Sequence, residues 1–318
     1  MNLFRNVLAA LALTSVSALA LAQSSWPDKP LRLIVPAAPG GASDLLARIL
    51  AERLGQALGQ QVIVDNRAGA SGAIGAMAVA RAAPDGYTLL LGGQGANVLN
   101  MVMFPEQGLT TRDFAPISLV ASGPLLLLVA PSAPFKSLTE LVAAAKAAPG
   151  KYSFASIGLG SAGHMTGEAL MARAGIKLLH VPYKAGGQIF TDTMSGQVTM
   201  MFGIGVRNYI DDGRLKALGA TSLRRSSIAP DVPSFAESGL RDFEIDTWFG
   251  IFAPAKTPAP IVRRLADELA KIAAPAEMAQ RLVNLGMVPR ASTPEQFDAM
   301  LAKEMSMWTE ITKNISVK

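Results

Sequence analysis

The sequence predicts an α/β protein with two lobes, each a mostly parallel sheet flanked by helices. Short apolar segments typical of strands alternate with segments whose apolar residues recur at helical spacing, which is the pattern of β-α-β units. The order strand, glycine-rich turn, helix occurs twice in succession over residues 31–82 and again over residues 152–195. Two similar lobes that aim helix N-termini at a shared cleft would produce this order.

The first half of the chain shows the alternation clearly. The helix predicted after the first strand carries leucine and isoleucine residues on one face at helical spacing. The turn Pro84-Asp85-Gly86 introduces the third strand. In order, the predicted elements are strand 31–35, helix 43–58, strand 61–65, helix 74–82 and strand 87–91.

The alternation restarts after Gly123. Ser137 and Glu140 have the spacing of a capping box that opens a helix, and Ser234 and Glu237 repeat this spacing. In order, the predicted elements are strand 125–130, the helix after Ser137, strand 152–157, helix 161–174, strand 177–181, helix 189–195, and strands 197–202 and 215–221.

The last part of the chain is predicted to return to the first lobe. Residues 243–252 form a long extended run that is expected to cross back. Pro260 lies near the start of one C-terminal helix. The capping box Thr293-Pro294-Glu295-Gln296, with proline at the first helical position, opens another that runs to about residue 312. We expect lobe 1 to comprise residues 26–123 and 246–318, and lobe 2 residues 124–245.

The N-terminus has the features of a signal peptide over residues 1–22. Arg5 precedes an uncharged apolar run from 7 to 21, and Ala20-Leu21-Ala22 offers the pattern of small residues that a signal peptidase reads. We expect cleavage near Ala22 and a periplasmic location, with an uncleaved membrane anchor as the alternative. The chain has no cysteine, which excludes disulfides, thiol nucleophiles and thiolate metal sites.

Composition favours a small anionic ligand over a nucleic acid. The chain has 318 residues, is 50% hydrophobic and carries a formal net charge of +5. A mild positive balance suits an anion. The basic residues do not cluster, since Arg224-Arg225 and Arg263-Arg264 are the only adjacent pairs, so we expect no nucleic-acid partner.

Four glycine-rich turns between a strand and a helix are the predicted binding site. A helix leaves its first N–H groups unpaired and is positive at that end, and glycine lets a ligand approach the backbone closely. Several N-termini facing one cleft could hold a carboxylate without an arginine. The turns are Pro39–Asp44, Asn66–Gly72, Gly158–His164 and Tyr183–Gly187.

Individual residues of these turns are expected to contact the ligand. Lys184 would supply mobile positive charge, whereas His164 could donate to a carboxylate or pack over its helix end. Asp44 is expected to cap a helix, Asp192 could brace the loop beside it, and Trp248 is expected to be a core residue. The candidate ligand-binding residues are Gly40, Gly41, Ala42, Ser43, Asp44, Gly69, Ala70, Ser71, Gly72, Ser161, His164, Tyr183, Lys184, Ala185 and Gly186.

Enzyme and cofactor motifs find little support. The sequence from Gly158 to Gly163 matches G-x-G-x-x-G, but the next strand ends without the acidic residue that a dinucleotide ribose needs. Neither His164 nor His180 belongs to a metal-ligand pattern, and no nucleophile has a base at a known motif spacing. We therefore expect no catalytic residue, no metal and no cofactor.

At these turns the chain resembles the substrate-binding proteins of tripartite tricarboxylate transporters, also called the Bordetella uptake gene family. The resemblance covers essentially the whole mature chain. It implies a Venus flytrap fold, a periplasmic location, delivery of ligand to a membrane permease, and carboxylates held by loop backbone amides and ordered waters. The matching segments are 66–75 (NRAGASGAIG), 84–90 (PDGYTLL), 134–146 (PFKSLTELVAAAK), 180–184 (HVPYK), 213–218 (GRLKAL) and 230–239 (PDVPSFAESG).

Two residues depart from the family pattern near the expected pocket. Ala37 stands after Pro36, where the family carries an aromatic residue, and Gln188 stands where the family often has proline. We expect Ala37 to enlarge the pocket, so that an aromatic or bulky carboxylate would fit. The leading hypothesis is a monomeric binding protein for a dicarboxylate, tricarboxylate or aromatic carboxylate. The alternatives are a carboxylate sensor that feeds a two-component system and, after it, a hydrolase or lyase.

Overall fold

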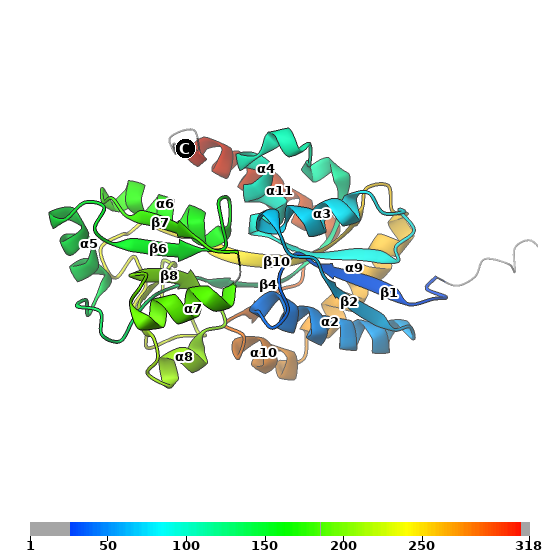
Figure 1. Cartoon of the computed structure of the whole chain (residues 1–318). Coiled ribbons are helices and arrows are strands. Elements are labelled where there is room, and N and C mark those ends of the chain that lie inside the picture. Colours follow the sequence, from blue (N-terminus) through cyan, green and yellow to red (C-terminus); the bar gives the residue numbers. More distant parts are fainter. Residues whose placement is uncertain (1–25, 185, 313–318) are drawn as a thin grey trace, which may run out of the picture.

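The computed structural model describes residues 26–184 and 186–312, which form two sheets side by side with helices packed around each (Figure 1). The predicted signal peptide lies outside the described residues. None of the helices in the described ranges is long and apolar enough to cross a membrane.

The first sheet has the strand order β11-β4-β10-β3-β1-β2. Strand β1 pairs in parallel with β2 and β3, whereas β10 is antiparallel to both β3 and β4. The strands are β1 (Leu31–Val35), β2 (Val62–Asn66), β3 (Thr88–Gly93), β4 (Phe114–Pro124), β10 (Asp246–Pro254) and β11 (Val288–Pro289).

The second sheet has the order β7-β6-β8-β5-β9. Strand β6 is parallel to β7 and β8, and β5 is antiparallel to β8 and β9. The strands are β5 (Leu126–Val129), β6 (Ser153–Ser156), β7 (Leu179–Pro182), β8 (Met200–Gly203) and β9 (Lys216–Ala220).

Two strand segments connect the sheets. Strand β4 continues through Leu125 into β5, and β10 brings the chain back, so the predicted two-lobed α/β architecture with crossing strands is confirmed (Figure 1). The sheets are less parallel than predicted: parallel pairing is limited to β2-β1-β3 and β7-β6-β8, while β10 and β5 run antiparallel to the strands beside them. Strand β4 was not predicted, because its Pro116, Gly123 and Pro124 break the strand pattern.

Helices cover both faces of each sheet. On the first sheet, α2 and α9 bury Leu46 and Leu265 against one face, while α11 buries Phe297 and Trp308 against the other. The helices around the first sheet are α2 (Ala42–Leu58), α3 (Ala73–Ala80), α4 (Asn100–Met103), α9 (Ala259–Ala273), α10 (Ala276–Val283) and α11 (Pro294–Thr312). Those around the second are α5 (Leu138–Ala147), α6 (Ala162–Ala174), α7 (Gly186–Ser195) and α8 (Arg207–Asp211).

Two of the three predicted capping boxes open helices. Ser137 Oγ accepts the Glu140 N–H at 3.2 Å at the start of α5. Thr293 Oγ1 likewise accepts the Gln296 N–H at the start of α11. The capping box at Ser234 also forms, since the Ser234 hydroxyl accepts the Glu237 N–H at 3.1 Å. It is followed by a turn and not by a helix, and this turn ends at Gly239, whose φ is 100°.

Candidate functional site

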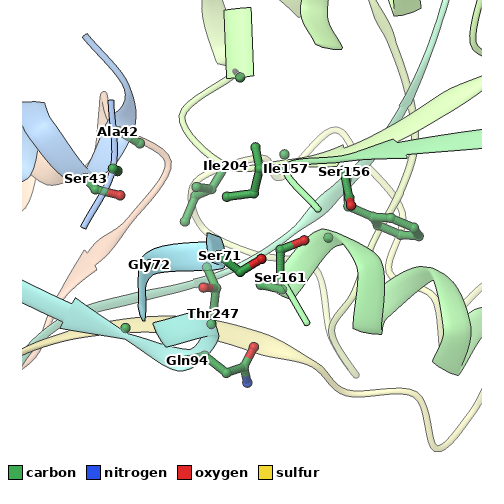
Figure 2. Close-up of a pocket in the computed structure, with 18 of the residues that line it drawn as sticks. Ala42, Ser43, Ser71, Gly72, Gln94, Ser156, Ile157, Ser161, Ile204 and Thr247 are labelled. Carbon is green, nitrogen blue, oxygen red and sulfur yellow. The ribbon is translucent and has the colours of Figure 1, made fainter. Parts of the chain in front are cut away.

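A cavity of about 300 Å³ lies between the two sheets, and all four glycine-rich turns contribute to its wall. Figure 2 shows residues of the first-sheet side facing residues of the second-sheet side across it. Of the predicted ligand-binding residues, those that line the cavity are Ala42, Ser43, Ser71, Gly72, Ser161 and Gly186.

The first turn places the N-terminus of α2 at the cavity. Gly41 is the N-cap, and Ala42 and Ser43 in the first helical turn line the wall. Asp44 is buried, and its Oδ2 accepts the Gly40 N–H at 3.0 Å and Arg48 Nε at 3.0 Å. Asp44 therefore holds the turn in shape, and the capping position expected for it belongs to Gly41.

The charge state of Asp44 follows from these contacts. Burial alone would raise the pKa of its carboxyl, but the hydrogen bonds from Arg48 and from the Gly40 N–H outweigh burial and lower the pKa below its usual value. An ionised Asp44 in the first turn also interacts favourably with the positive end of α2. Gly40, Gly41 and Asp44 support the turn from outside the cavity wall.

The second turn is strained. Ala70 and Ser71 have φ of 46° and 52°, in the left-handed region that non-glycine residues seldom adopt, at about 1–3 kcal/mol each. Asn100 Nδ2 donates to the Ala70 carbonyl at 3.0 Å, and Ser71 Oγ donates to the Leu159 carbonyl at 2.7 Å. The second bond joins a turn beside the first sheet to a turn beside the second sheet. Gly69 and Ala70 are not among the residues that line the cavity.

The third turn presents the N-terminus of α6. Ser161 is the N-cap, with its Oγ accepting the His164 N–H at 3.3 Å and donating to the Gly158 carbonyl at 2.7 Å. Ala162 and Gly163, in the first helical turn, line the cavity. Their N–H groups precede the first intrahelical hydrogen bond, which the Met165 N–H donates to the Ser161 carbonyl.

The two histidines lie behind this turn. His164 is 3% exposed, and its Nδ1 accepts the Gly160 N–H at 3.2 Å, so it packs over the helix end and is not among the residues that line the cavity. His180 Nε2 lies 2.7 Å from Oγ of Ser156, which does line the cavity. Burial, reinforced by the neighbouring His164, lowers the pKa of His180 to about 4.

This shift makes stability depend on pH. The unfolded chain takes up the His180 proton near pH 6.5, whereas the folded chain takes it up only near pH 4. Between these values the unfolded state binds more protons, so we expect the free energy of unfolding to fall as the pH is lowered from 6.5 to 4. Urea denaturation at several pH values should show a shallower fall for His180→Gln; an equal fall in both proteins would contradict this origin.

The fourth turn contributes less to the cavity than expected. Tyr183 donates its hydroxyl to Asp192 Oδ2 at 2.7 Å, and burial together with this carboxylate raises the pKa of Tyr183 to about 12. The bond confirms that Asp192 braces this turn. Lys184 is exposed and does not line the cavity. Ala185 is not among the residues that the structure describes. Gly186, at the start of α7, lines the cavity.

Several lining residues were not among the predicted ones. Gln94, Ser156, Ile157, Ile204 and Thr247 all line the cavity (Figure 2). Ser156 ends the parallel strand β6 and Ile157 follows it, at the carboxyl end where ligands collect, so this position was a usable signal. The other three lie at or after the strands β3, β8 and β10, and only the strand order of the folded sheets brings them to the cavity; they are Gln94, Ile204 and Thr247.

Three further expectations concern residues around the cavity. Ala37, expected to enlarge the pocket, is part of its wall, whereas Gln188 is not. Trp248 lines the cavity and is only 3% exposed, so this residue belongs both to the cavity wall and to the predicted core.

The hydrogen-bond donors that the cavity can present to an anion are uncharged. No lysine, arginine or histidine is among its lining residues in the described ranges. The same ranges contain no group of three or more histidine, aspartate and glutamate side chains placed to hold a metal ion. Backbone N–H groups at two helix N-termini, supplemented by hydroxyls, are therefore the donors that the arrangement can present to a carboxylate.

Comparison with known proteins identifies the family of the chain. The model of the tripartite tricarboxylate transporter family receptor matches residues 46–317. The UPF0065 protein in the tcbD-tcbE intergenic region of Pseudomonas sp. (strain P51) is 40% identical, over 96% of this chain and 93% of that protein.

Solved structures agree with the sequence match. The periplasmic binding protein BugD superposes with a TM-score of 0.83 at 34% identity, over 92% of this chain and 99% of that one. Rpa4515 of R. palustris, solved with adipate, gives a TM-score of 0.87 at 30% identity, with coverages of 91% and 98%. MatC of Rhodopseudomonas palustris, solved with bound malate, gives a TM-score of 0.83 at 30% identity, over 90% of this chain and 99% of that one. The chain therefore belongs to the tripartite tricarboxylate transporter receptor family, whose members are periplasmic solute-binding proteins.

Proposed function

We propose that this protein captures a small organic carboxylate in the periplasm and delivers it to the permease of a tripartite tricarboxylate transporter. The observation that carries the proposal is the meeting of two helix N-termini, those of α2 and α6, at one cavity between the sheets. Adipate and malate in the related structures are carboxylates of the size that such a cavity would take.

Capture works by closure of two lobes around the ligand. Residues 26–123 and 246–318 make one lobe and residues 124–245 the other, in a protein that acts as a monomer after loss of residues 1–22. A ligand that touches both lobes binds the closed state better and shifts the population toward it. The bond from Ser71 to Leu159 crosses the cleft and adds to this closed state.

A thermal-shift screen of carboxylic acids tests the proposal. A ligand at 100 times its dissociation constant adds about 2.7 kcal/mol to the free energy of unfolding. We expect at least one acid in a broad set of mono-, di- and tricarboxylates to raise the melting temperature, and its neutral amide to have no effect. A set in which no acid raises it would refute carboxylate capture.

Ala37 should control the size of ligand that fits. Replacing Ala37 with phenylalanine adds a ring to the cavity wall, so we expect affinity for benzoate to fall at least tenfold and affinity for succinate to change less. Isothermal titration of both acids measures this, with Ala37→Val as the control for a smaller addition. An unchanged benzoate affinity in the phenylalanine variant would show that this wall does not limit ligand size.

A further inference from the structure

Three of the five hydroxyl groups that line the cavity, those of Ser71, Ser156 and Ser161, already donate their protons to the protein. Ser71 Oγ donates to the Leu159 carbonyl at 2.7 Å, and Ser161 Oγ donates to the Gly158 carbonyl at 2.7 Å. The Ser156 hydroxyl donates to the Gly158 carbonyl at 3.1 Å and also lies 2.7 Å from His180 Nε2. These three serines therefore have no further proton for a ligand oxygen.

An apolar wall stands beside these serines. Ile157 follows β6 and Ile204 follows β8, and Figure 2 shows the two side chains next to each other on the cavity. Phe190 of α7 lines the cavity as well. Ile157 is 51% exposed and lines the cavity, so its side-chain surface is available to a ligand.

From these two features we infer that the cavity selects carboxylates whose body is apolar, built of methylene groups or an aromatic ring, and rejects those whose body carries hydroxyl groups. The inference rests on the proposed function and adds a specificity to it. A carboxylate is satisfied by the N–H groups at the N-termini of α2 and α6. A hydroxyl on the ligand body, pressed against Ile157 and Ile204, would lose its bonds to water without full replacement.

A ligand with an apolar body gains binding free energy at the same wall. Contact with Ile157, Ile204 and Phe190 removes apolar surface of both partners from water. The residue that should contribute most to this selection is Ile157, because its side chain is half exposed and stands on the wall itself. Ile157 is thus the proposed specificity-determining residue.

Matched pairs of acids test the inference by isothermal titration. The pairs are adipate with galactarate, succinate with tartrate, and benzoate with 3,4-dihydroxybenzoate, each differing only in hydroxyl groups. We expect the member without hydroxyls to bind at least tenfold more tightly in every pair that binds. Ile157→Asn should reduce this ratio at least fivefold, and Ile157→Val should retain it.

A control variant separates a local effect from a general one. Ile63 on β2 is also an exposed isoleucine, at 45%, but does not line the cavity, so Ile63→Asn should leave the ratio unchanged. Equal or tighter binding of the hydroxylated members would overturn the inference while leaving carboxylate capture intact. The same holds if Ile157→Asn keeps the full ratio. If none of the six acids binds, the inference falls, and the broader screen of the proposed function decides whether carboxylate capture falls with it.

Discussion

The Gly163→Leu variant is expected to fold like the parent protein and to bind its carboxylate at least a hundredfold more weakly. Gly163 lies in the first turn of α6 and lines the cavity. A Cβ atom placed there would lie 3.6 Å from Ser156 Cβ and 3.9 Å from the Phe202 carbonyl oxygen, both ordinary contact distances to lining residues. The helix accepts the substitution, and the remaining carbons of the leucine occupy the space of the ligand.

Stability should not fall in this variant. Leucine is more favourable than glycine in a helix by roughly 0.5–1 kcal/mol, so any loss of binding reflects the filled cavity. Gly163→Ala is the matched control, because its methyl group fits at van der Waals distance and should retain most of the affinity. Isothermal titration and urea denaturation of both variants measure the two effects. Full binding by Gly163→Leu would place the ligand elsewhere.

The Trp308→Ala variant is expected to lose about 3–5 kcal/mol of unfolding free energy. Trp308 is fully buried and anchors α11 in the core against the first sheet. Truncation removes the apolar contacts of its ring and leaves a cavity that the surrounding helix and sheet cannot close completely. Since Trp308 does not line the ligand cavity, carboxylate affinity of the folded fraction should remain within about twofold.

Urea denaturation and titration of the same preparation check this separation. Trp308→Phe, which keeps an aromatic ring, should lose less stability than Trp308→Ala. A loss below 1 kcal/mol in the alanine variant would mean that α11 packs differently from the arrangement described.

The sequence predicted most elements because local signals sufficed for them. The leucines of α2 recur at helical spacing, and Ser137 with Glu140 marks the start of α5, so neither element depends on distant residues. Strand β4 was missed because Pro116 lies inside it. The structure accommodates this proline opposite Phe252 at a shift in register with β10, a long-range pairing that no local pattern reveals.

The candidate site was predictable to a similar degree. Glycine-rich turns after strands identify the N-termini of α2 and α6, and both lie at the cavity. The apolar wall was not foreseen, because Ile157 and Ile204 are distant in sequence and meet only when β6 and β8 pair. His164 illustrates the opposite case, since a polar residue in a promising turn pairs with the backbone of that turn.

The most direct test of carboxylate binding at these helix N-termini is a crystal structure of the protein with the tightest-binding acid from the screen. We predict a carboxylate in the cavity, with its oxygens at hydrogen-bonding distance, about 2.7–3.2 Å, from N–H groups of the α2 or α6 first turns, directly or through one water. A carboxylate held instead by a lysine or arginine side chain outside this cavity would contradict it.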